Sequence, residues 1–385
     1  MMFRRLFVHS IISRNKCSSG GHIKLTKFSG LSLTFNQQIR KMSNEKSNVL
    51  IGTHSGIFHC DEILACYILQ QLPKYEKAQI VRTRDDAVLK DCDIVVDVGS
   101  VFDAEKLRFD HHQKTFQDTL GSLRPEFAEK FSKVRLSSAG LIYTHYGEEV
   151  IGRLVKRLKG IELSQECLRR VFEKVYENFI QEIDGIDNGV PQHPDEPVYR
   201  ISTHLSARVG HFNSEWNSTG DFDEQAQFEK AKELVGAEFV DSVLYYSTVW
   251  WPARAIVTGA IKSRFDLHSS GKIIELAQFC PWKQHLYDLE KVEKCEGDIL
   301  YCICASAPDD HRVICVSKTA SSFVCRKFLP PSWRGIRDAD LESVSNIADT
   351  KFVHATGFIG GAKTRNAVLQ MAINAIESTE EEQST

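Results

Sequence analysis

The sequence lacks the features of several specialised protein classes. A membrane-spanning helix needs a run of about 18 apolar residues. The 385-residue sequence contains no such run, so no membrane span is expected. Eleven cysteines are present, but no two are spaced as Cys-x-x-Cys, and an odd number does not suit a complete disulfide framework. No internal repeat is visible. With 42% hydrophobic and 26% charged residues, the chain can bury a full core without disulfides or structural zinc.

Acidic residues are also missing from the first 44 positions, which hold eight lysines and arginines among many serines. This composition is typical of a mitochondrial targeting segment. We therefore predict a leader over residues 1–46 and a location in the mitochondrial matrix. The alternative is a disordered basic tail. Met42 directly follows the basic stretch, so initiation there would give a nuclear or cytosolic form without the leader.

The rest of the chain is acidic. The whole chain has 48 basic and 51 acidic residues, and removing the eight basic residues of the first 44 positions leaves 40 basic residues against 51 acidic ones. A negative surface of this kind repels the phosphates of long duplex DNA. Contact with nucleic acid is therefore expected only in a local groove or at a chain end.

Hydrophobic patterning predicts an α/β protein of two lobes. The first lobe, residues 47–265, is expected to hold a mostly parallel sheet with flanking helices, because short apolar strands alternate with helical segments. The second lobe, residues 266–377, is smaller and holds a second sheet and a final helix. Residues 378–385 are acidic, polar and predicted to be disordered. The predicted strands are 47–53, 78–84, 93–98, 272–276, 299–305, 313–317 and 352–355, and the predicted helices are 61–72, 136–146, 163–183, 222–265 and 364–377, with a break near Pro252.

Three side chains that can bind metals lie between the first predicted strand and the first predicted helix. They are His54, His59 and Asp61, and they fall within eight residues. Loops at the carboxyl ends of parallel strands form crevices, and Gly56 permits a tight turn there. Asp61 could instead cap the helix, but capping does not account for two flanking histidines.

Further candidate ligands follow later in the same predicted lobe. Asp97 ends an apolar strand, where a buried carboxylate needs a partner or a cation. Asp110, His111 and His112 are consecutive and follow an apolar residue. Together with the three residues above, they form a large mixed set of carboxylates and imidazoles.

Asp184 and Asp187 complete this set, although one of them could be a helix cap. They are three positions apart and would share one helix face if the helix continues through both. Oxygen and imidazole ligands suit Mn²⁺, Mg²⁺ or Fe²⁺ better than structural zinc, which favours cysteine. A set this large can hold two ions, which would activate water and stabilise a phosphoryl oxygen.

The order of these motifs resembles that of the DHH phosphoesterase superfamily, which includes single-strand exonucleases, nanoRNases and manganese-dependent pyrophosphatases. The chain is most similar to one branch, the melanocyte proliferating gene 1 family, over about residues 48–376. The segments that carry this resemblance are 52–54, 58–62, 95–99, 110–113, 136–143 and 352–361. The resemblance implies a DHH-like fold of two lobes and a 3′–5′ RNA exonuclease found in mitochondria and nucleus.

The resemblance also implies roles for individual residues. His59 stands where many members of the superfamily carry aspartate, and an imidazole there softens the site. In the Asp110-His111-His112 motif, His111 is an implied ligand, whereas His112 is expected to stabilise the oxygens of the reacting phosphate. Asp187 is favoured over Asp184 as the last ligand. The implied metal ligands are His54, His59, Asp61, Asp97, His111 and either Asp187 or Asp184.

Candidate substrate contacts lie in the second lobe. They are His354, Gly360, Gly361, Lys363, Arg365 and Arg334. The two glycines are predicted to form a turn into the last helix, where free N–H groups and the two basic residues that follow can hold an anion. The resemblance implies that such a glycine-rich motif, with a histidine or arginine, holds the substrate phosphate. The alternatives are a plain turn for the glycines and surface charge for Arg334.

The predicted activity is hydrolysis of single-stranded RNA from its 3′ end to nucleoside monophosphates, with two Mn²⁺ or Mg²⁺ ions. One alternative is a phosphohydrolase that acts on pyrophosphate or short oligonucleotides. Another is a non-catalytic RNA-binding protein, which the complete ligand set disfavours. No obligate protein partner is inferred, and the oligomeric state is left open.

Mapping of N-terminal peptides checks the prediction of a second start. A form that begins at Met42 or directly after it should accompany the form made from the first methionine. Absence of any N-terminal peptide at this position, or of ribosome footprints there, would contradict a start at Met42.

Overall fold

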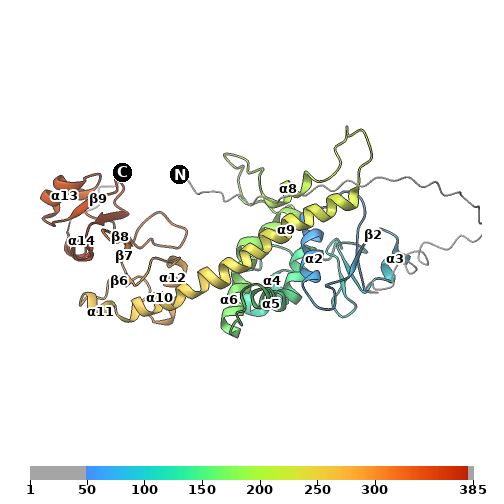
Figure 1. Cartoon of the computed structure of the whole chain (residues 1–385), viewed down its shortest axis with the longest axis horizontal. Coiled ribbons are helices and arrows are strands. Elements are labelled where there is room, and N and C mark those ends of the chain that lie inside the picture. Colours follow the sequence, from blue (N-terminus) through green and yellow to red (C-terminus); the bar gives the residue numbers. More distant parts are fainter. Residues whose placement is uncertain (1–48, 380–385) are drawn as a thin grey trace, which may run out of the picture. The chain divides into compact units, whose positions relative to one another are not determined.

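A computed structural model describes residues 49–379, so the predicted leader and most of the predicted acidic tail lie outside the described residues. The described chain is α/β, with two five-stranded sheets and flanking helices (Figure 1). The predicted α/β class with two sheets is therefore confirmed. We call the elements packed around the first sheet the first lobe and those packed around the second sheet the second lobe.

The first sheet is mostly parallel, as predicted. Its strand order is β2-β1-β3-β5-β4, and only the edge strand β4 is antiparallel to its neighbour. The short strands β4 and β5 were not predicted, because two-residue strands carry no periodic signal. The bounds are β1 (Leu50–Thr53), β2 (Gln79–Arg82), β3 (Ile94–Val96), β4 (Phe102–Asp103) and β5 (Arg108–Phe109).

Helix α2 (Cys60–Gln70) is at the centre of the first lobe. Nine of its residues are buried, and it packs against α5 (Ser138–Lys159) and α9 (Glu224–Tyr245). A helix that is apolar on nearly all sides is stable only when other elements surround it. Its amino end, which carries candidate metal ligands, is therefore held in place by the lobe's main core.

The predicted helix over 163–183 is present, with a local irregularity. It consists of α6 (Gln165–Val175), the π-helical segment η2 (Tyr176–Ile180) and α7 (Gln181–Asp187). The other short helices of the first lobe are α3 (Asp86–Lys90), α4 (Leu120–Leu123), η1 (Pro125–Phe127) and α8 (Leu205–Gly210). No helix within residues 49–379 is long and apolar enough to cross a membrane.

The predicted break near Pro252 was wrong. Pro252 is the second residue of α10 (Trp251–Lys262), which continues from α9 through the π-helical segment η3 (Tyr246–Trp250), as Figure 1 shows. Proline lacks the N–H that an α-helix needs and crowds the preceding turn. A π-helical turn is wider and accommodates such a residue without ending the helix. Helix α11 (Arg264–Leu267) follows.

The second sheet has the order β6-β7-β8-β10-β9, in which only β6 and β7 are parallel. Alternate residues of its strands belong to two separate clusters, one with α14 and the other with α10 and α12. The two faces of the sheet are therefore covered by different helices. The bounds are β6 (Ile273–Leu276), β7 (Tyr301–Ala307), β8 (Asp310–Cys315), β9 (Thr350–Val353), β10 (Ile359–Ala362), α12 (Lys283–Val292), η4 (Pro331–Trp333), α13 (Asp338–Ser345) and α14 (Arg365–Glu377).

The predicted glycine-rich turn at Gly360 and Gly361 was also wrong. Both glycines lie inside β10, which pairs with β8 on one side and β9 on the other. A Cβ on Gly360 would lie 2.8 Å from Met371 Cε, and one on Gly361 would lie 2.7 Å from Phe352 Cε1. A larger residue at either position would force neighbouring side chains to move, so close packing favours glycine here. The N-cap of α14 is Thr364, whose side chain accepts from the backbone of Ala367.

Exchange of Gly236 for alanine tests the contact between α9 and α2. A Cβ there would lie 2.1 Å from Tyr67 Cε2, so Gly236→Ala should lower the free energy of unfolding by roughly 1–3 kcal/mol. Gly259→Ala is the matched control, because no atom lies within 4 Å of its Cβ position in α10. Alanine should stabilise that exposed helical site by up to about 1 kcal/mol. Urea unfolding measures both, and equal midpoints for the two variants would contradict the close contact.

Candidate metal centre

The candidate ligands of the first lobe gather at one edge of its sheet. His54 directly follows β1, Asp97 directly follows β3, and His111 comes two residues after β5. These strands are parallel neighbours, so their carboxyl ends meet at the same edge. The first turn of α2 supplies Asp61 and Glu62 to the same cluster.

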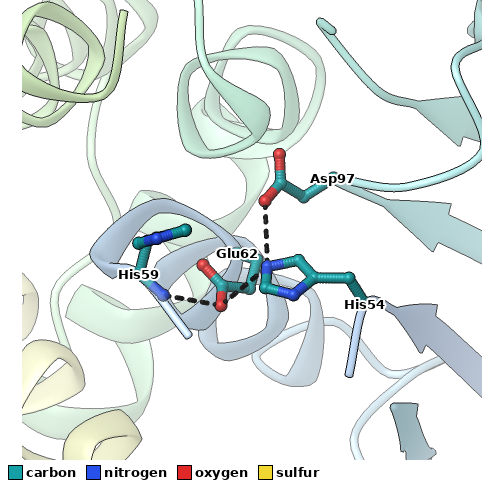
Figure 2. A group of neighbouring side chains, drawn as sticks. All are labelled: His54, His59, Glu62 and Asp97. Atoms are coloured by element: carbon teal, nitrogen blue, oxygen red, sulfur yellow. Dashed lines mark hydrogen bonds and ion pairs between the residues drawn. The ribbon is translucent and has the colours of Figure 1, made fainter. Parts of the chain in front are cut away.

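One group consists of His54, His59, Glu62 and Asp97, whose candidate ligand atoms lie within 4.8 Å of one another (Figure 2). His54 Nε2 lies 3.2 Å from Glu62 Oε1 and 3.4 Å from Asp97 Oδ2. The other ring nitrogen of His54, Nδ1, lies 3.4 Å from the carbonyl oxygen of Ser55. Donation from Nδ1 to that carbonyl would leave Nε2 free to bind a metal ion.

His111 joins the remaining carboxylates. Its Nε2 lies 3.1 Å from Asp187 Oδ2, 3.2 Å from Asp97 Oδ1 and 4.0 Å from Asp61 Oδ2. Asp97 thus faces His54 with one oxygen and His111 with the other. Its φ of 59° lies in the left-handed region, which aspartate tolerates better than most residues. This turn at the end of β3 directs the carboxylate into the cluster.

Several buried polar atoms of the cluster are unsatisfied. Within residues 49–379, no hydrogen-bond partner is found for Asp61 Oδ1 or Glu62 Oε2, and Asp97 Oδ1 and His111 Nε2 lie 3.2 Å apart as charged groups without the geometry of a hydrogen bond. Buried polar atoms without partners are costly, and most native proteins avoid them. A cation bound by carboxylate oxygens and imidazole nitrogens would satisfy these atoms together. The residues present therefore fit a divalent metal ion.

The same residues have perturbed proton affinities. Burial, with neighbouring negative charge, raises the pKa of Asp61 well above its usual range. Burial alone would lower the pKa values of His54 and His111, but adjacent carboxylates raise both to about 10. Burial would raise the pKa of Asp97, but contacts with the two histidines hold it well below its usual range. Metal binding would replace the histidine protons as the source of positive charge.

Two adjacent serines at the start of α5 hold two different carboxylates. The Oγ of Ser138 donates to Asp61 Oδ2 at 2.7 Å, and its backbone N–H donates to the same oxygen at 3.3 Å. Asp184 Oδ1 accepts from the N–H and the Oγ of Ser137, at 2.9 and 2.7 Å, and Tyr176 donates to Asp184 Oδ2 at 3.1 Å. The segment 136–143 therefore orients one candidate ligand and fixes α7 against α5.

The structure separates Asp187 from Asp184. Asp187 Oδ2 faces His111, whereas both oxygens of Asp184 are hydrogen-bonded away from the cluster. A Cβ on Gly140 would lie 2.3 Å from Asp184 Oδ1, so this carboxylate is packed against the backbone of α5. Burial raises the pKa of Asp184 to about 7. The structure thus places Asp187, and not Asp184, among the candidate ligands.

Asp110 does not face the cluster but holds His112. Its Oδ2 accepts from the backbone of Ser100 at 2.5 Å, and its Oδ1 accepts from the backbone and Nδ1 of His112, at 3.2 and 2.7 Å. The contact with Asp110 raises the pKa of His112. The His112 side chain is 59% exposed and lines a cavity. With Nδ1 bound to Asp110, Nε2 is the nitrogen that can donate to a ligand in this cavity.

The cavity lies beside the cluster, within the first lobe. Its volume is about 880 Å³, within the range of sites for small molecules. His59, Asp61, His111, His112 and Asp187 line it, as do residues of α8 and the loop that follows α8. Four of the candidate metal ligands, His59, Asp61, His111 and Asp187, are therefore accessible to a ligand of nucleotide size.

The second-lobe candidates do not line this cavity. Arg365 forms two hydrogen bonds with Glu275, each 2.6 Å long, and Arg334 donates to the carbonyl of Leu329 at 3.0 Å. His354 and Lys363 are exposed. The predicted substrate contacts of the second lobe are thus not part of the lining of this cavity, and their role stays a prediction.

Glu62 is the residue of the cluster that sequence reasoning missed. It is fully buried in α2 and belongs to the same group as His54 and Asp97. Its backbone contact also shapes the loop, because Glu62 Oε1 accepts from the N–H of His59 at 2.8 Å. A second carboxylate directly before the apolar run 63–66 was a usable signal, since burying it carries the same cost that singled out Asp97.

Comparison with known proteins finds a family whose model matches most of this chain. Residues 50–376 match the family described as "Uncharacterised protein family (UPF0160)", whose name is MYG1 exonuclease in short form. The chain is 46% identical to "MYG1 exonuclease" of Homo sapiens over 324 residues, covering 84% of each chain. It is 43% identical to "MYG1 protein" of Dictyostelium discoideum over 337 residues, covering 86% of this chain and 98% of that protein. Among solved structures, none matches this chain.

Two asparagine variants test which aspartate holds metal. Asp187→Asn should weaken Mn²⁺ binding by at least about tenfold, because it removes a charge from the cluster. Asp184→Asn should chiefly lower the free energy of unfolding, by about 1–3 kcal/mol, because it disturbs buried hydrogen bonds. Titration of chelator-treated protein with Mn²⁺, followed by thermal unfolding, measures both quantities. A larger loss of metal affinity in Asp184→Asn than in Asp187→Asn would contradict the placement of α7.

Proposed function

This chain belongs to the MYG1 family, and from that premise we propose that it is a metal-dependent exonuclease that shortens single-stranded RNA from its 3′ end. The products would be nucleoside monophosphates. Nuclease activity is supported by relatives that carry the name MYG1 exonuclease and are 45–46% identical to this chain. The choice of RNA and the direction of shortening are part of the proposal.

The observation that carries the proposal is the group of buried, unsatisfied ligand atoms beside a nucleotide-sized cavity. His54, His59, Glu62 and Asp97 would hold one ion. A second would be held by His111 with Asp61, Asp97 and Asp187. Two bound ions, Mn²⁺ or Mg²⁺, would lower the pKa of water and stabilise the negative charge that develops on the phosphoryl oxygens.

The protein's own groups would orient the reacting phosphate. His112 can donate from Nε2 to a phosphoryl oxygen, because Asp110 holds its Nδ1 and keeps the ring in one orientation. Ser138 keeps Asp61 in place, and the contact of Asp184 with Ser137 keeps α7 in place. Asp61 and the Asp187 of α7 therefore need not reorganise during the reaction. This fixed arrangement is what electrostatic stabilisation of a transition state requires.

A second candidate is hydrolysis of pyrophosphate or short oligonucleotides. The acidic charge of the chain beyond residue 44, 40 basic against 51 acidic residues, favours a substrate smaller than a long RNA. The dependence of turnover on RNA length distinguishes the two. An enzyme for small substrates should not prefer a long strand.

We also propose that the protein acts in mitochondria, with a shorter form in the nucleus or cytosol. The support is the composition of the first 44 residues, which lack acidic side chains, and the position of Met42. RNA processing in both compartments would follow from this distribution.

A time course with 5′-labelled single-stranded RNA tests the activity. Wild-type protein should produce a ladder that shortens from the 3′ end with Mn²⁺ or Mg²⁺ and no ladder with EDTA. His111→Ala should reduce the rate at least about 1,000-fold, because it removes a candidate metal ligand that lies beside three carboxylates.

His193→Ala is the matched control, since this histidine is exposed and lies outside the cavity lining. Its rate should equal that of the wild type. Intact RNA in every metal condition would rule out the exonuclease, and pyrophosphate and dinucleotides would then be assayed. Equal rates for His111→Ala and His193→Ala would exclude the cluster as the active site.

A further inference from the structure

The cavity beside the metal cluster has a basic side as well as an acidic one. Arg135 and His204 line it together with Asp61, His111 and Asp187, and the exposed Lys114 also lies in its lining. Arg135 belongs to the segment before α5, and His204 is the N-cap of α8. A ligand that fills the cavity would therefore contact cationic donors in addition to the candidate metal ligands.

Arg135 is a half-buried arginine that has no carboxylate partner among the described residues. Within residues 49–379, no carboxylate forms an ion pair with it, whereas Arg82, Arg124 and Arg208 of the same lobe each pair with a glutamate. Its side-chain contact is a long one, from Nη1 to the carbonyl of Phe116 at 3.5 Å. A guanidinium group in this setting can form charge-assisted, paired hydrogen bonds with a phosphate.

The backbone of Arg135 is tied to the metal cluster. Its carbonyl accepts from the side chain of Asn188, which directly follows Asp187. Arg135 also lies two residues before Ser137, whose side chain donates to Asp184. The backbone from which the Arg135 side chain extends is thus fixed relative to α7 and to the candidate ligands.

His204 offers a hydrogen-bond donor in the same cavity. Its Nδ1 accepts from the backbone N–H of Ala207 at 3.3 Å and caps α8. In the neutral ring this leaves the proton on Nε2. The loop after α8 is connected to the loop between β1 and α2 through Asn213, which accepts from the N–H of Phe58 and donates to its carbonyl. His204 is therefore held near the cluster by contacts at both ends of α8.

We propose that Arg135 and His204 form a phosphate-binding subsite for single-stranded nucleic acid. It holds the phosphate next to the one that is cleaved, and it rests on the proposed nuclease function. A cavity of about 880 Å³ has room for a terminal nucleotide between the metal cluster and this subsite. The subsite would favour a strand with at least two phosphates over a single phosphodiester, and would do so within the first lobe.

RNA binding in the absence of turnover tests the subsite. Fluorescence anisotropy of a 5′-labelled single-stranded RNA is measured in EDTA at several salt concentrations. Arg135→Gln should weaken binding about tenfold and reduce the salt-dependence slope by about one phosphate contact. His204→Asn should weaken binding while keeping the N-cap, because asparagine caps helices well.

Arg153→Gln is the control, because Arg153 is an exposed residue of α5 outside the cavity lining. It should leave both affinity and slope unchanged. With metal added, Arg135→Gln should raise KM for the RNA more than it lowers kcat, and its stabilisation by Mn²⁺ should equal that of the wild type.

Binding curves for Arg135→Gln that match the wild type at every salt concentration would overturn the proposal, as would failure of wild-type protein to bind RNA. A loss of affinity without a change of slope would also overturn it, because such a loss indicates a structural role. If Arg135→Gln alters the slope but wild-type protein does not cleave RNA, the subsite stands and the exonuclease proposal fails.

Discussion

Mutual repulsion of buried carboxylates is the constraint that shapes the first lobe. Asp61, Glu62 and Asp97 are almost fully buried near the carboxyl ends of the strands, and Asp187 Oδ2 approaches the same cluster, 3.1 Å from His111 Nε2. Like charges in a poorly solvated space are tolerated only when hydrogen bonds, cations or protons compensate them. The surrounding elements provide part of this compensation. The amino end of α2 carries a partial positive charge beside two of the carboxylates, and Ser138 donates twice to one of them.

Much of this site could be predicted from the sequence, for physical reasons. A carboxylate next to an apolar strand signals a partner, so Asp97 was found, and consecutive metal-capable residues signalled the segment 110–112. The choice between Asp184 and Asp187 could not be made from their spacing. It depends on η2, the π-helical segment before α7, and on contacts with Ser137 and Tyr176. The contact with Ser137 joins residues that are 47 positions apart, and a local sequence pattern does not predict such a contact.

The second lobe shows a different limit of sequence reasoning. Paired glycines usually indicate a turn, because turns need their backbone freedom. In β10 the glycines are favoured for a different reason: an extended strand has neighbouring side chains packed closely against it. The same strand was missed because two of its four residues carry no side chain that could show alternation. The strands β6 to β9, which have branched and aromatic residues, were found near their actual positions.

Ser137 and Ser138 are neighbours in sequence, but they bind carboxylates on different helices, α7 and α2. Ser137 is the N-cap of α5, with an extended backbone, and Ser138 is its first helical residue, so the two hydroxyl groups leave the start of α5 in different directions and reach different helices. The geometry of the cluster therefore depends on the count of residues at this point as much as on their identity. One inserted or deleted residue before Gly140 would rotate both hydroxyl groups away from their partners. Among relatives, changes of length should be tolerated in the exposed segment 190–203 and should be absent from 136–140.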